Sequence, residues 1–256
     1  MVKPKVVIVT QARIGSTRFP GKVLERIGND SMLGLHLKRL KRSTIADSIV
    51  VATTNEKGVE SIIDIANEEG VLTYKGSTND VLDRFYQAVK DIKPDFVVRV
   101  TSDCPLIDAR LIDLVINMTI ENNLDYGSNI LKEEYPDGQD IEVILWDVLA
   151  LAWQVAKLPS EREHVTPYIR SNTDSNGGQL FKAMNYASPY NFNGIRMTVD
   201  ERADIEAIRN LVNQLGPVND WRRYADYIIN HPSEFSNQAI IRNAEYYKSI
   251  QKDLNT

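Results

Sequence analysis

The sequence predicts an α/β fold in which a doubly wound, mostly parallel sheet carries helices on both faces. Short runs rich in β-branched residues recur along the chain, and most are followed by segments whose apolar residues have helical spacing. The chain has 256 residues, enough for a large core, and shows no repeat and no low-complexity linker. We therefore expect a single domain over residues 1–256, in which residues 221–256 form a helical C-terminal extension.

These patterns place the elements in order. The clearest strands are expected at Val6 to Thr10, Ile49 to Thr53, Phe96 to Thr101 and Ile195 to Val199, and weaker ones at Val71 to Tyr74 and Gln139 to Trp146. Helices are expected at Met32 to Arg42, Val59 to Glu69, Asp80 to Lys90, Leu111 to Ile120, Asp147 to Ala156, Glu161 to Arg170, Ala203 to Leu215 and Trp221 to Asn230. The Asn and Gly residues of Ser171 to Gln179 are typical of a surface loop.

Composition restricts the partners. The net charge is -5, and duplex nucleic acid, which requires many phosphate contacts, is not expected to bind. The most apolar later stretch, Val143 to Trp153, is interrupted by Asp147, so we expect no contact with a membrane. The single cysteine, Cys104, excludes an internal disulfide framework and a multi-cysteine zinc site. Its neighbour Asp103 would raise the pKa of the thiol, which argues against a nucleophile. The single cysteine fits a reducing cytosol, so we expect a cytoplasmic location.

A cationic loop follows the first strand directly. Residues 11–22 read Gln-Ala-Arg-Ile-Gly-Ser-Thr-Arg-Phe-Pro-Gly-Lys, and residues 1–22 contain no Asp or Glu. Arg13 and Arg18 can grip phosphate oxygens with a two-pronged fork, and Lys22 adds a point charge, a combination suited to a triphosphate. The alternative is a solvated loop whose Pro-Gly pair only turns the chain.

Two common phosphate-binding loops do not fit this segment. Gly15 to Gly21 encloses five residues where the P-loop of nucleotide hydrolases has four, and Val23 stands where that loop needs Ser or Thr. No Gly-x-Gly-x-x-Gly fingerprint follows the strand.

Two carboxylates follow predicted strands. Asp103 comes after the run Phe96 to Thr101, and Asp200 comes after Ile195 to Val199. In a parallel sheet both would lie over the same carboxyl edge, where they could share one Mg²⁺ ion with substrate phosphates. The alternative is that each aspartate caps the helix that follows it.

The cationic loop resembles the signature of cytidylyltransferases that activate sugars, including the synthetases of CMP-octulosonate and CMP-sialate. The closest likeness is to the branch called spore coat polysaccharide biosynthesis protein F. Further matching blocks occur in the family's order at residues 76–84, 98–107, 135–138, 161–168 and 198–200. The resemblance implies a nucleotide-diphospho-sugar transferase-like fold and a nucleotidyltransferase domain.

The resemblance also implies site residues. In that family the aspartates that match Asp103 and Asp200 hold the metal beside the α-phosphate. The catalytic residues would be Arg13, Arg18 and Lys22, and the nucleotide-binding residues Gln11, Ala12, Gly15, Ser16, Ser77 and Thr101. Asp80 is typical of a helix cap and Arg84 of a solvated helix residue, so neither receives a role.

The acceptor region is less defined. Arg162, His164 and Tyr168, opposite Asp137, Gln139 and Glu142, form a candidate acceptor pocket; the alternatives are a dimer contact or a satisfied core. The octulosonate enzymes carry Gln and Gly where this chain has Thr101 and Ser102, which leaves the sugar open. A homodimer is expected from the family, and the aromatic stretch Trp221 to Tyr247 could serve it.

The sequence therefore predicts Mg²⁺-dependent transfer of CMP from CTP to an acidic sugar or a phosphorylated acceptor, with release of pyrophosphate, for surface polysaccharide. Such chemistry requires mainly positioning and neutralisation of charge. Two alternatives stay open. One is a glycosyltransferase that uses a nucleotide sugar on a similar fold, although this chain has no Asp-x-Asp triplet. The other is a nucleotide-binding protein without catalytic activity.

Overall fold

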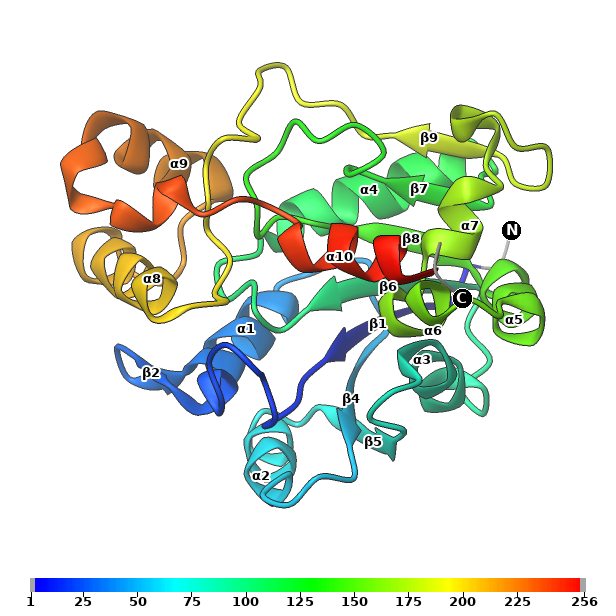
Figure 1. Cartoon of the computed structure of the whole chain (residues 1–256), viewed down its shortest axis with the longest axis horizontal. Helices are drawn as coiled ribbons and strands as arrows, with labels where there is room; N and C mark the ends of the chain where they lie inside the picture. The colour runs from blue at the N-terminus through cyan, green and yellow to red at the C-terminus, as the bar shows by residue number, and fades with distance from the viewer. Residues whose placement is uncertain (1–2, 254–256) are drawn as a thin grey trace.

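A seven-stranded sheet forms the centre of the computed structural model, which describes residues 3–253 (Figure 1). Its strand order is β5-β4-β1-β6-β8-β7-β9. The strands are β1 (Val6–Gln11), β4 (Ser48–Thr54), β5 (Leu72–Gly76), β6 (Phe96–Thr101), β7 (Tyr126–Ser128), β8 (Glu142–Leu145) and β9 (Ala183–Asn185). Within this sheet β8 runs antiparallel to both neighbours, whereas the other pairs are parallel. The mostly parallel sheet is thus confirmed.

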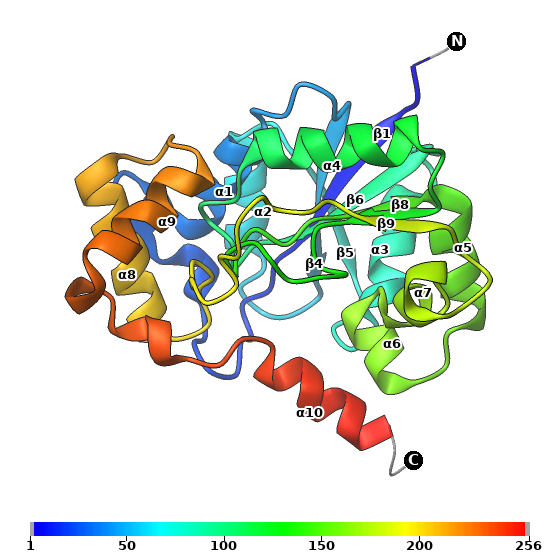
Figure 2. The ribbon, with the colours of Figure 1, turned by 90° about the horizontal axis from the view of Figure 1, so that it is seen from above.

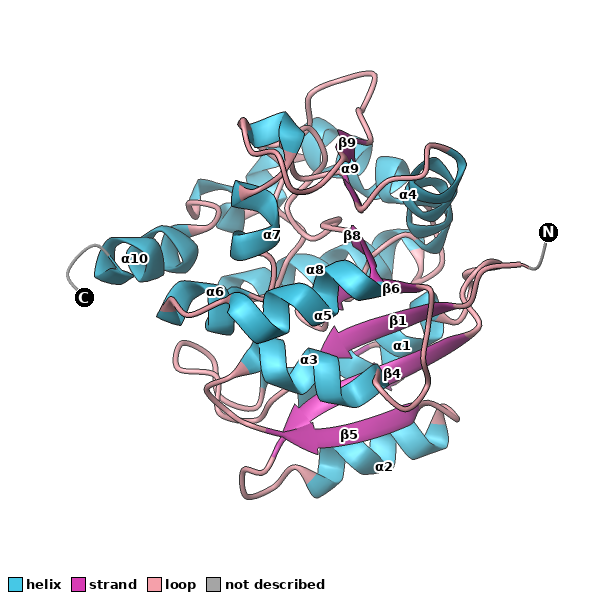
Figure 3. Ribbon diagram, turned by 90° about the vertical axis from the view of Figure 1, so that its right-hand side faces the viewer, coloured by secondary structure: helices cyan, strands magenta, loops and turns pink. Residues whose placement is uncertain are grey.

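Helices cover both faces of the sheet. They are α1 (Met32–Leu40), α2 (Glu60–Glu68), α3 (Val81–Val89), α4 (Ala109–Glu121), α5 (Trp146–Val155), α6 (Pro159–His164), α7 (Pro167–Ser171), α8 (Arg202–Leu215), α9 (Trp221–Asn230) and α10 (Ala244–Asp253). Figure 3 shows α3 and α5 in front of the sheet, with α1 and α2 behind it. A small hairpin, β2 (Arg26–Ile27) with β3 (Asp30–Ser31), lies apart from the main sheet.

The alternation of β1 explains the two layers. Its residues Val6 and Ile8 pack with the apolar faces of α1, α2, α4 and α8, while Val7 and Val9 pack with those of α3 and α5. All four valine and isoleucine side chains are fully buried. A strand that is apolar on both faces requires cover on both, and β1 accordingly lies inside the sheet, between β4 and β6.

Two predicted elements are wrong. Residues 195–199 are extended but form no strand, because their backbone bonds go to separate segments: Met197 N–H donates to Asp137 O at 2.7 Å and Val199 N–H to Asp103 O at 2.8 Å. The expected helix from Glu161 to Arg170 is two helices, since Val165 has φ 73° and Pro167 starts α7.

Other elements lack a strong signal in the sequence. The strands β7 and β9 have only three residues each, too few for a periodic pattern. The expected strand Gln139 to Trp146 is shorter, since β8 covers only Glu142–Leu145 and α5 begins at once. The C-terminal helix α10 lies within the stretch 221–256 that was expected to be helical, although no bounds were predicted for a helix after Asn230. It packs on α6 and projects from the rim of the molecule (Figure 2).

Candidate active site

The loop after β1 folds back on itself before the short helix Lys22–Leu24. Gly21 has φ 72° and ψ 10°, a left-handed conformation that glycine adopts without strain, and its N–H donates to Ile14 O at 2.9 Å. Phe19 is buried and anchors the loop, with the Arg202 guanidinium 4.9 Å from its ring centroid. The turn therefore directs Lys22 inward, while Arg18 stays at the surface.

Lys22 joins the loop to both predicted metal ligands. Its Nζ donates to Val199 O at 2.6 Å and lies 3.0 Å from Asp200 Oδ1 and 3.4 Å from Asp103 Oδ2. Arg18 Nη2 is also 3.0 Å from Asp200 Oδ1. Burial by itself would lower the pKa of Lys22, but the two carboxylates raise it, so the ammonium stays charged. Loop and carboxylates thus meet at one point.

Asp103 extends from the carboxyl end of β6. Its backbone oxygen accepts hydrogen bonds from Val199 N–H at 2.8 Å and Thr198 Oγ1 at 3.3 Å, which fastens the segment before Asp200 to the sheet. Burial would raise the pKa of Asp103, but Lys22 and the hydrogen bond from Thr101 lower it. The carboxylate is therefore ionised at neutral pH.

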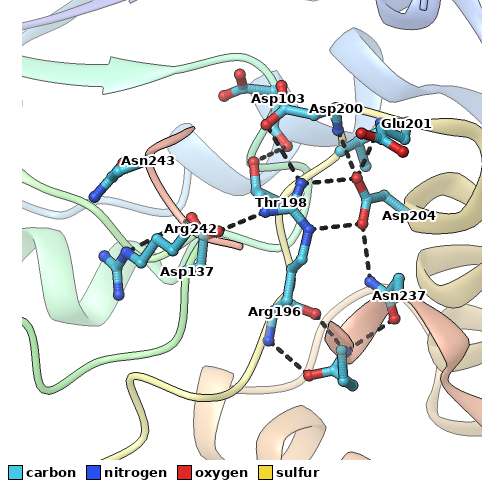
Figure 4. Close-up of polar contacts among 12 residues, drawn as sticks. Asp103, Asp137, Arg196, Thr198, Asp200, Glu201, Asp204, Asn237, Arg242 and Asn243 are labelled. Atoms are coloured by element: carbon cyan, nitrogen blue, oxygen red, sulfur yellow. Dashed lines mark hydrogen bonds and ion pairs between the residues drawn. The ribbon is translucent and has the colours of Figure 1, made fainter. Parts of the chain in front are cut away.

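The capping alternative does not hold for the side chain of Asp200. The start of α8 is capped by Asp204, whose Oδ2 accepts from the N–H groups of Asp200 and Glu201, each at 2.9 Å. Arg196 lies between the acids, 2.8 Å from Asp137, 2.8 Å from Asp204 and 3.3 Å from Asp200 (Figure 4). The Asp200 carboxylate is consequently held toward Lys22 rather than toward the helix.

The loop borders a cavity of about 600 Å³, here called the loop cavity. Its wall consists of Gln11, Ala12, Arg13, Ser16, Thr17, Arg18, Lys22, Val23, Thr78, Asn79, Val81, Arg84, Thr101, Ser102, Asp103, Pro159, Arg162, Glu163, His164 and Asp200. The wall is rich in cations and hydroxyl groups, the composition expected around a polyphosphate.

A second cavity of about 240 Å³, the carboxylate cavity, adjoins the first. Both are lined by Gln11, Arg18, Thr101, Asp103, His164 and Asp200. The carboxylate cavity alone is lined by Arg99, Cys104, Ile130, Glu133, Asp137, Asp140, Glu142, Thr166, Arg170, Thr198, Ile241, Asn243 and Tyr246. The two aspartates therefore stand at the junction of two compartments.

Arginines balance the acids of the carboxylate cavity. Burial would raise the pKa of Glu142, but Arg99 and Arg170 lower it, and the Tyr126 hydroxyl donates to its Oε1 at 2.6 Å. Burial and the neighbouring Asp140 raise the pKa of Asp137 to about 7, although Arg242 and Arg196 oppose this. This compartment can present both acceptor and donor groups to a polar molecule.

The predicted nucleotide-binding residues divide into two groups. Gln11, Ala12, Ser16 and Thr101 line the loop cavity. Gly15 and Ser77 lie outside its wall: Gly15 N–H donates to Glu56 Oε2 at 3.3 Å, and Ser77 Oγ accepts from Asp80 N–H at 3.0 Å.

Only two of the three predicted acceptor residues, Arg162 and His164, share a cavity wall. Arg162 lines the loop cavity and pairs with Asp80, its Nη2 lying 2.6 Å from Oδ2. His164 lines both cavities and its Nε2 lies 2.7 Å from Ser249 Oγ. Tyr168 lies in neither wall and packs edge-on against Phe181.

Several polar residues of the carboxylate cavity escaped the sequence analysis. They include Arg99, Glu133, Asp140, Arg170, Asn243 and Tyr246. One signal was available: Arg99 is a charged residue inside an otherwise apolar strand, a position that requires a partner, and it pairs with Glu142 of the neighbouring strand. Gln139, in contrast, is fully buried and bonds to backbone groups of Leu106 and Asp108, a structural role.

The donors at the junction fit Mg²⁺. Among the side chains that the structure describes, no group of three or more His, Cys, Asp or Glu residues is arranged to hold a metal ion. Asp103 and Asp200 nevertheless direct carboxylate oxygens to the same ammonium. Mg²⁺ is usually held by one or two carboxylates, with substrate phosphates and water completing the coordination.

Comparison with known proteins identifies the family. A family model described as cytidylyltransferase matches residues 6–245. The chain belongs to the cytidylyltransferase family. It is accordingly a nucleotidyltransferase, as the resemblance of its motifs predicted.

Relatives of this cytidylyltransferase agree with that assignment. The spore coat polysaccharide biosynthesis protein SpsF of Bacillus subtilis is 31% identical over 218 residues, which cover 82% of this chain and 88% of that protein. A solved cytidylyltransferase from Leptospira borgpetersenii superposes with a TM-score of 0.86 at 33% identity, covering 93% of this chain and all of that one. A solved CMP-2-keto-3-deoxy-manno-octonic acid synthetase shares the fold, with a TM-score of 0.60 at 18% identity, over 82% of this chain and 99% of that one. Among the described helices, none has the length and apolar character needed to span a membrane.

Proposed function

We propose that this cytidylyltransferase transfers CMP from CTP to an acidic sugar or a phosphorylated acceptor, with Mg²⁺ as cofactor. The observation that carries the proposal is the junction of the two cavities at Asp103 and Asp200. A nucleotide in the loop cavity and an acceptor in the carboxylate cavity would meet at these two side chains.

The loop residues supply the electrostatics of the reaction. Arg13, Arg18 and Lys22 lie along one wall of the loop cavity and would bind the triphosphate. The attraction between these cations and the phosphates is strongest where water is excluded, because the local dielectric constant is low there. Mg²⁺ held by Asp103 and Asp200 would neutralise the charge that develops on the phosphates. An acceptor oxygen attacks the α-phosphorus, the bond from this phosphorus to the bridging oxygen breaks, and pyrophosphate leaves while the acceptor proton passes to solvent.

The carboxylate cavity suits a polyhydroxylated acceptor with one anionic group. Asp137, Asp140 and Glu142 can accept hydrogen bonds from hydroxyls, and the guanidinium of Arg170 can receive an anion. The name of the relative SpsF, a protein of spore coat polysaccharide biosynthesis, supports a product used for surface polysaccharide.

The proposal is tested by incubating the protein with each nucleoside triphosphate, Mg²⁺ and a panel of sugar acids and sugar phosphates. We expect pyrophosphate release that requires CTP, Mg²⁺ and one class of acceptor, together with a CMP- or CDP-linked product by mass spectrometry. Pyrophosphate release that shows no preference for CTP over other nucleoside triphosphates would contradict the proposal that CTP is the substrate. Transfer of a glycosyl group from a nucleotide sugar would favour the glycosyltransferase alternative.

We also propose that the chain forms a homodimer, which the family resemblance predicts. Several aromatic side chains between Trp221 and Tyr247 already pack inside the chain and are not free for a dimer contact. Trp221 packs against Tyr135 and Phe192, and Tyr224 is fully buried. Light scattering coupled to gel filtration measures the mass; a value near 29 kDa, that of one chain, contradicts the dimer.

A further inference from the structure

One part of the carboxylate cavity has more cations than acids. Glu142 is paired with Arg99, whose Nε is buried without a hydrogen-bond partner. Arg170 lines the same wall, and among the residues that the structure describes no carboxylate lies within ion-pair distance of its guanidinium. That guanidinium lies 5.8 Å from the ring centroid of Tyr246. This basic part of the wall, Arg99 and Arg170, therefore has donors left for an anion.

Another part of the wall has more acids than cations. It consists of Glu133, Asp137 and Asp140, here called the acidic part. These three carboxylates surround one arginine, Arg242, whose nitrogens lie 3.8, 3.9 and 2.6 Å from them in that order. The Nε of Arg242 is buried and makes no hydrogen bond. One guanidinium therefore faces three negative charges.

A second arginine does not make up the difference. Arg196 Nη1 lies 2.8 Å from Asp137 Oδ2, but the same guanidinium also pairs with Asp204 at 2.8 Å and with Asp200 at 3.3 Å (Figure 4). Asp204 is fully buried, and a buried carboxylate requires a paired cation. The charge of Arg196 is thus shared, and the acidic part keeps an excess of negative charge in the free protein.

Asp137 combines a free oxygen with this excess charge. The residue is only 8% exposed, and within the described part of the chain its Oδ1 makes no hydrogen bond, since Arg242 Nε at 3.9 Å is too distant. Burial and Asp140, with a smaller effect of Asp200, raise the pKa of Asp137 to about 7 against the effect of Arg242 and Arg196. Near neutral pH this carboxyl therefore binds a proton about half of the time.

A ligand can replace that proton with a charge of its own. An ammonium group has one positive charge and three donors, whereas the free carboxylate oxygens of the acidic part are acceptors. A hydroxyl group could make one of the hydrogen bonds but would leave the excess charge in place. The basic part requires the opposite charge, so one ligand that satisfies both parts must carry both signs.

We propose that the acceptor is zwitterionic: its protonated amine binds Asp137 and Asp140, and its anionic group binds Arg170. The chemical class is an amino sugar, with a free amine, that also carries a carboxylate or a phosphate. Acylation of the amine would remove the charge that the acidic part requires. The proposal rests on the proposed transfer of CMP and narrows the class of acceptor.

Matched ligands test the proposal on the wild-type protein. One series is glucosamine 6-phosphate, glucose 6-phosphate and N-acetylglucosamine 6-phosphate; two others are the corresponding 1-phosphates and the corresponding aldonic acids. Dissociation constants are measured by calorimetry with Mg²⁺ and the α,β-methylene analogue of CTP present. In at least one series the amine should bind about tenfold or more tightly than both the hydroxyl and the acetamide. If no series shows this preference, the proposal is overturned.

The pH dependence of the preference tests the role of Asp137. In the series that shows the preference, the ratio of amine to hydroxyl affinity should rise several-fold from about pH 5.5 to about pH 7, because Asp137 loses its proton while the amine stays mostly protonated. Taking the ratio removes the titration of the ligand's own anionic group. A ratio that is independent of pH would overturn the assignment of the amine to Asp137.

Two variants locate the amine. Asp137→Asn and Asp140→Asn each remove one negative charge and should reduce the preference for the amine about tenfold, with less change for the hydroxyl ligand. Asp137→Asn should also abolish the pH dependence. Asp64→Asn, which changes an exposed residue of α2, is the matched control. Circular dichroism checks folding, and Asp140→Asn keeps Asp137 paired with Arg196. Wild-type preference in a folded variant of either acid overturns the proposal.

Turnover separates this proposal from the proposed function. If CTP-dependent release of pyrophosphate is observed with an acceptor whose amine gives no advantage, the zwitterionic acceptor fails while CMP transfer stands. If ligands with an amine bind through Asp137 and Asp140 but none of them releases pyrophosphate from CTP, CMP transfer fails while the zwitterionic site stands.

Discussion

The ammonium group of Lys22 organises the polar end of the site. It lies within 3.4 Å of carboxylate oxygens from two segments almost a hundred residues apart, Asp103 and Asp200. The same contacts give the two acids a common orientation in the absence of ligand. Because the arrangement is built before substrate arrives, little reorganisation is needed when a triphosphate enters.

At the residue scale, Asp200→Asn is expected to lower kcat/KM for pyrophosphate release by about 100-fold or more, because one of the two carboxylates proposed to hold Mg²⁺ loses its charge. The melting temperature should change little, since Asp204 rather than Asp200 caps α8. The measurement is a pyrophosphate assay over a range of Mg²⁺ concentrations.

Asp226→Asn is the matched control for Asp200→Asn. Asp226 forms an exposed pair with Arg222 within α9, and exposed pairs of this kind contribute little. An Asp200→Asn enzyme with the activity of this control would contradict the placement of Asp200 at the reacting phosphate.

At the element scale, a buried histidine connects α1 to the sheet. His36 Nδ1 lies 2.9 Å from Cys104 O, which can only accept, so this nitrogen carries the hydrogen and Nε2 accepts from Thr10 Oγ1, also at 2.9 Å. One neutral ring thus ties the helix to the end of β1 and to the turn after β6. It fixes the edge of the sheet from which Asp103 extends.

The buried position of His36 predicts that the folded protein loses stability in acid. Burial lowers the pKa of His36 to about 4, so the unfolded chain binds a proton near pH 6.5 whereas the folded chain does not. Stability therefore decreases as the pH falls from about 6.5 to about 4, by about 3 kcal/mol if this group acts alone. Urea unfolding at several pH values measures the slope.

Substitution of His36 tests whether this residue causes the pH dependence of stability. His36→Gln should be less stable at neutral pH but lose much of the decrease below pH 6.5. His231→Gln, which changes an exposed histidine, should keep the wild-type slope. An unchanged slope in His36→Gln would show that other groups cause the acid sensitivity.

At the scale of the whole molecule, the carboxylate cavity is assembled from distant parts of the chain. Strand β6, the loop before β8, the turn between α6 and α7 and the segment leading into α10 each contribute. Arg242 fastens that last segment, with Nη2 2.6 Å from Asp140. The ring of Tyr246 then lies 5.8 Å from the Arg170 guanidinium and edge-on to His164.

If the loop cavity and the carboxylate cavity bind different substrates, the KM values for CTP and for the acceptor should change independently. Tyr246→Ala should raise KM for the acceptor several-fold while leaving KM for CTP nearly unchanged, because Tyr246 lines only the carboxylate cavity. Initial rates with each substrate varied in turn measure both constants. Tyr247→Ala, which removes a ring that is 57% exposed, is the control. An equal rise in both KM values would contradict the division into two compartments.

Individual elements show which features could be predicted from the sequence and which could not. The β-branched run of β1 and the cationic loop after it are local signals, and both were recognised in the sequence before the structure placed the loop in the wall of the loop cavity. Arg84 was misplaced, since nothing in the spacing of α3 distinguishes a solvated arginine from one folded across a glycine of β5. The prediction of a strand at residues 195–199 was wrong because a run of β-branched residues indicates extended backbone but does not indicate which segment it pairs with.

Apolar periodicity and contiguous motifs are encoded over short stretches, so the layered architecture, the family and the chemistry of the cationic loop could be predicted from the sequence alone. The folded chain was needed to show that Asp200 faces Lys22, that Arg99 meets Glu142 from the neighbouring strand and that the C-terminal helix lines the carboxylate cavity. These contacts join residues tens to hundreds of positions apart. They depend on strand order and on the direction of side chains, which local patterns do not specify.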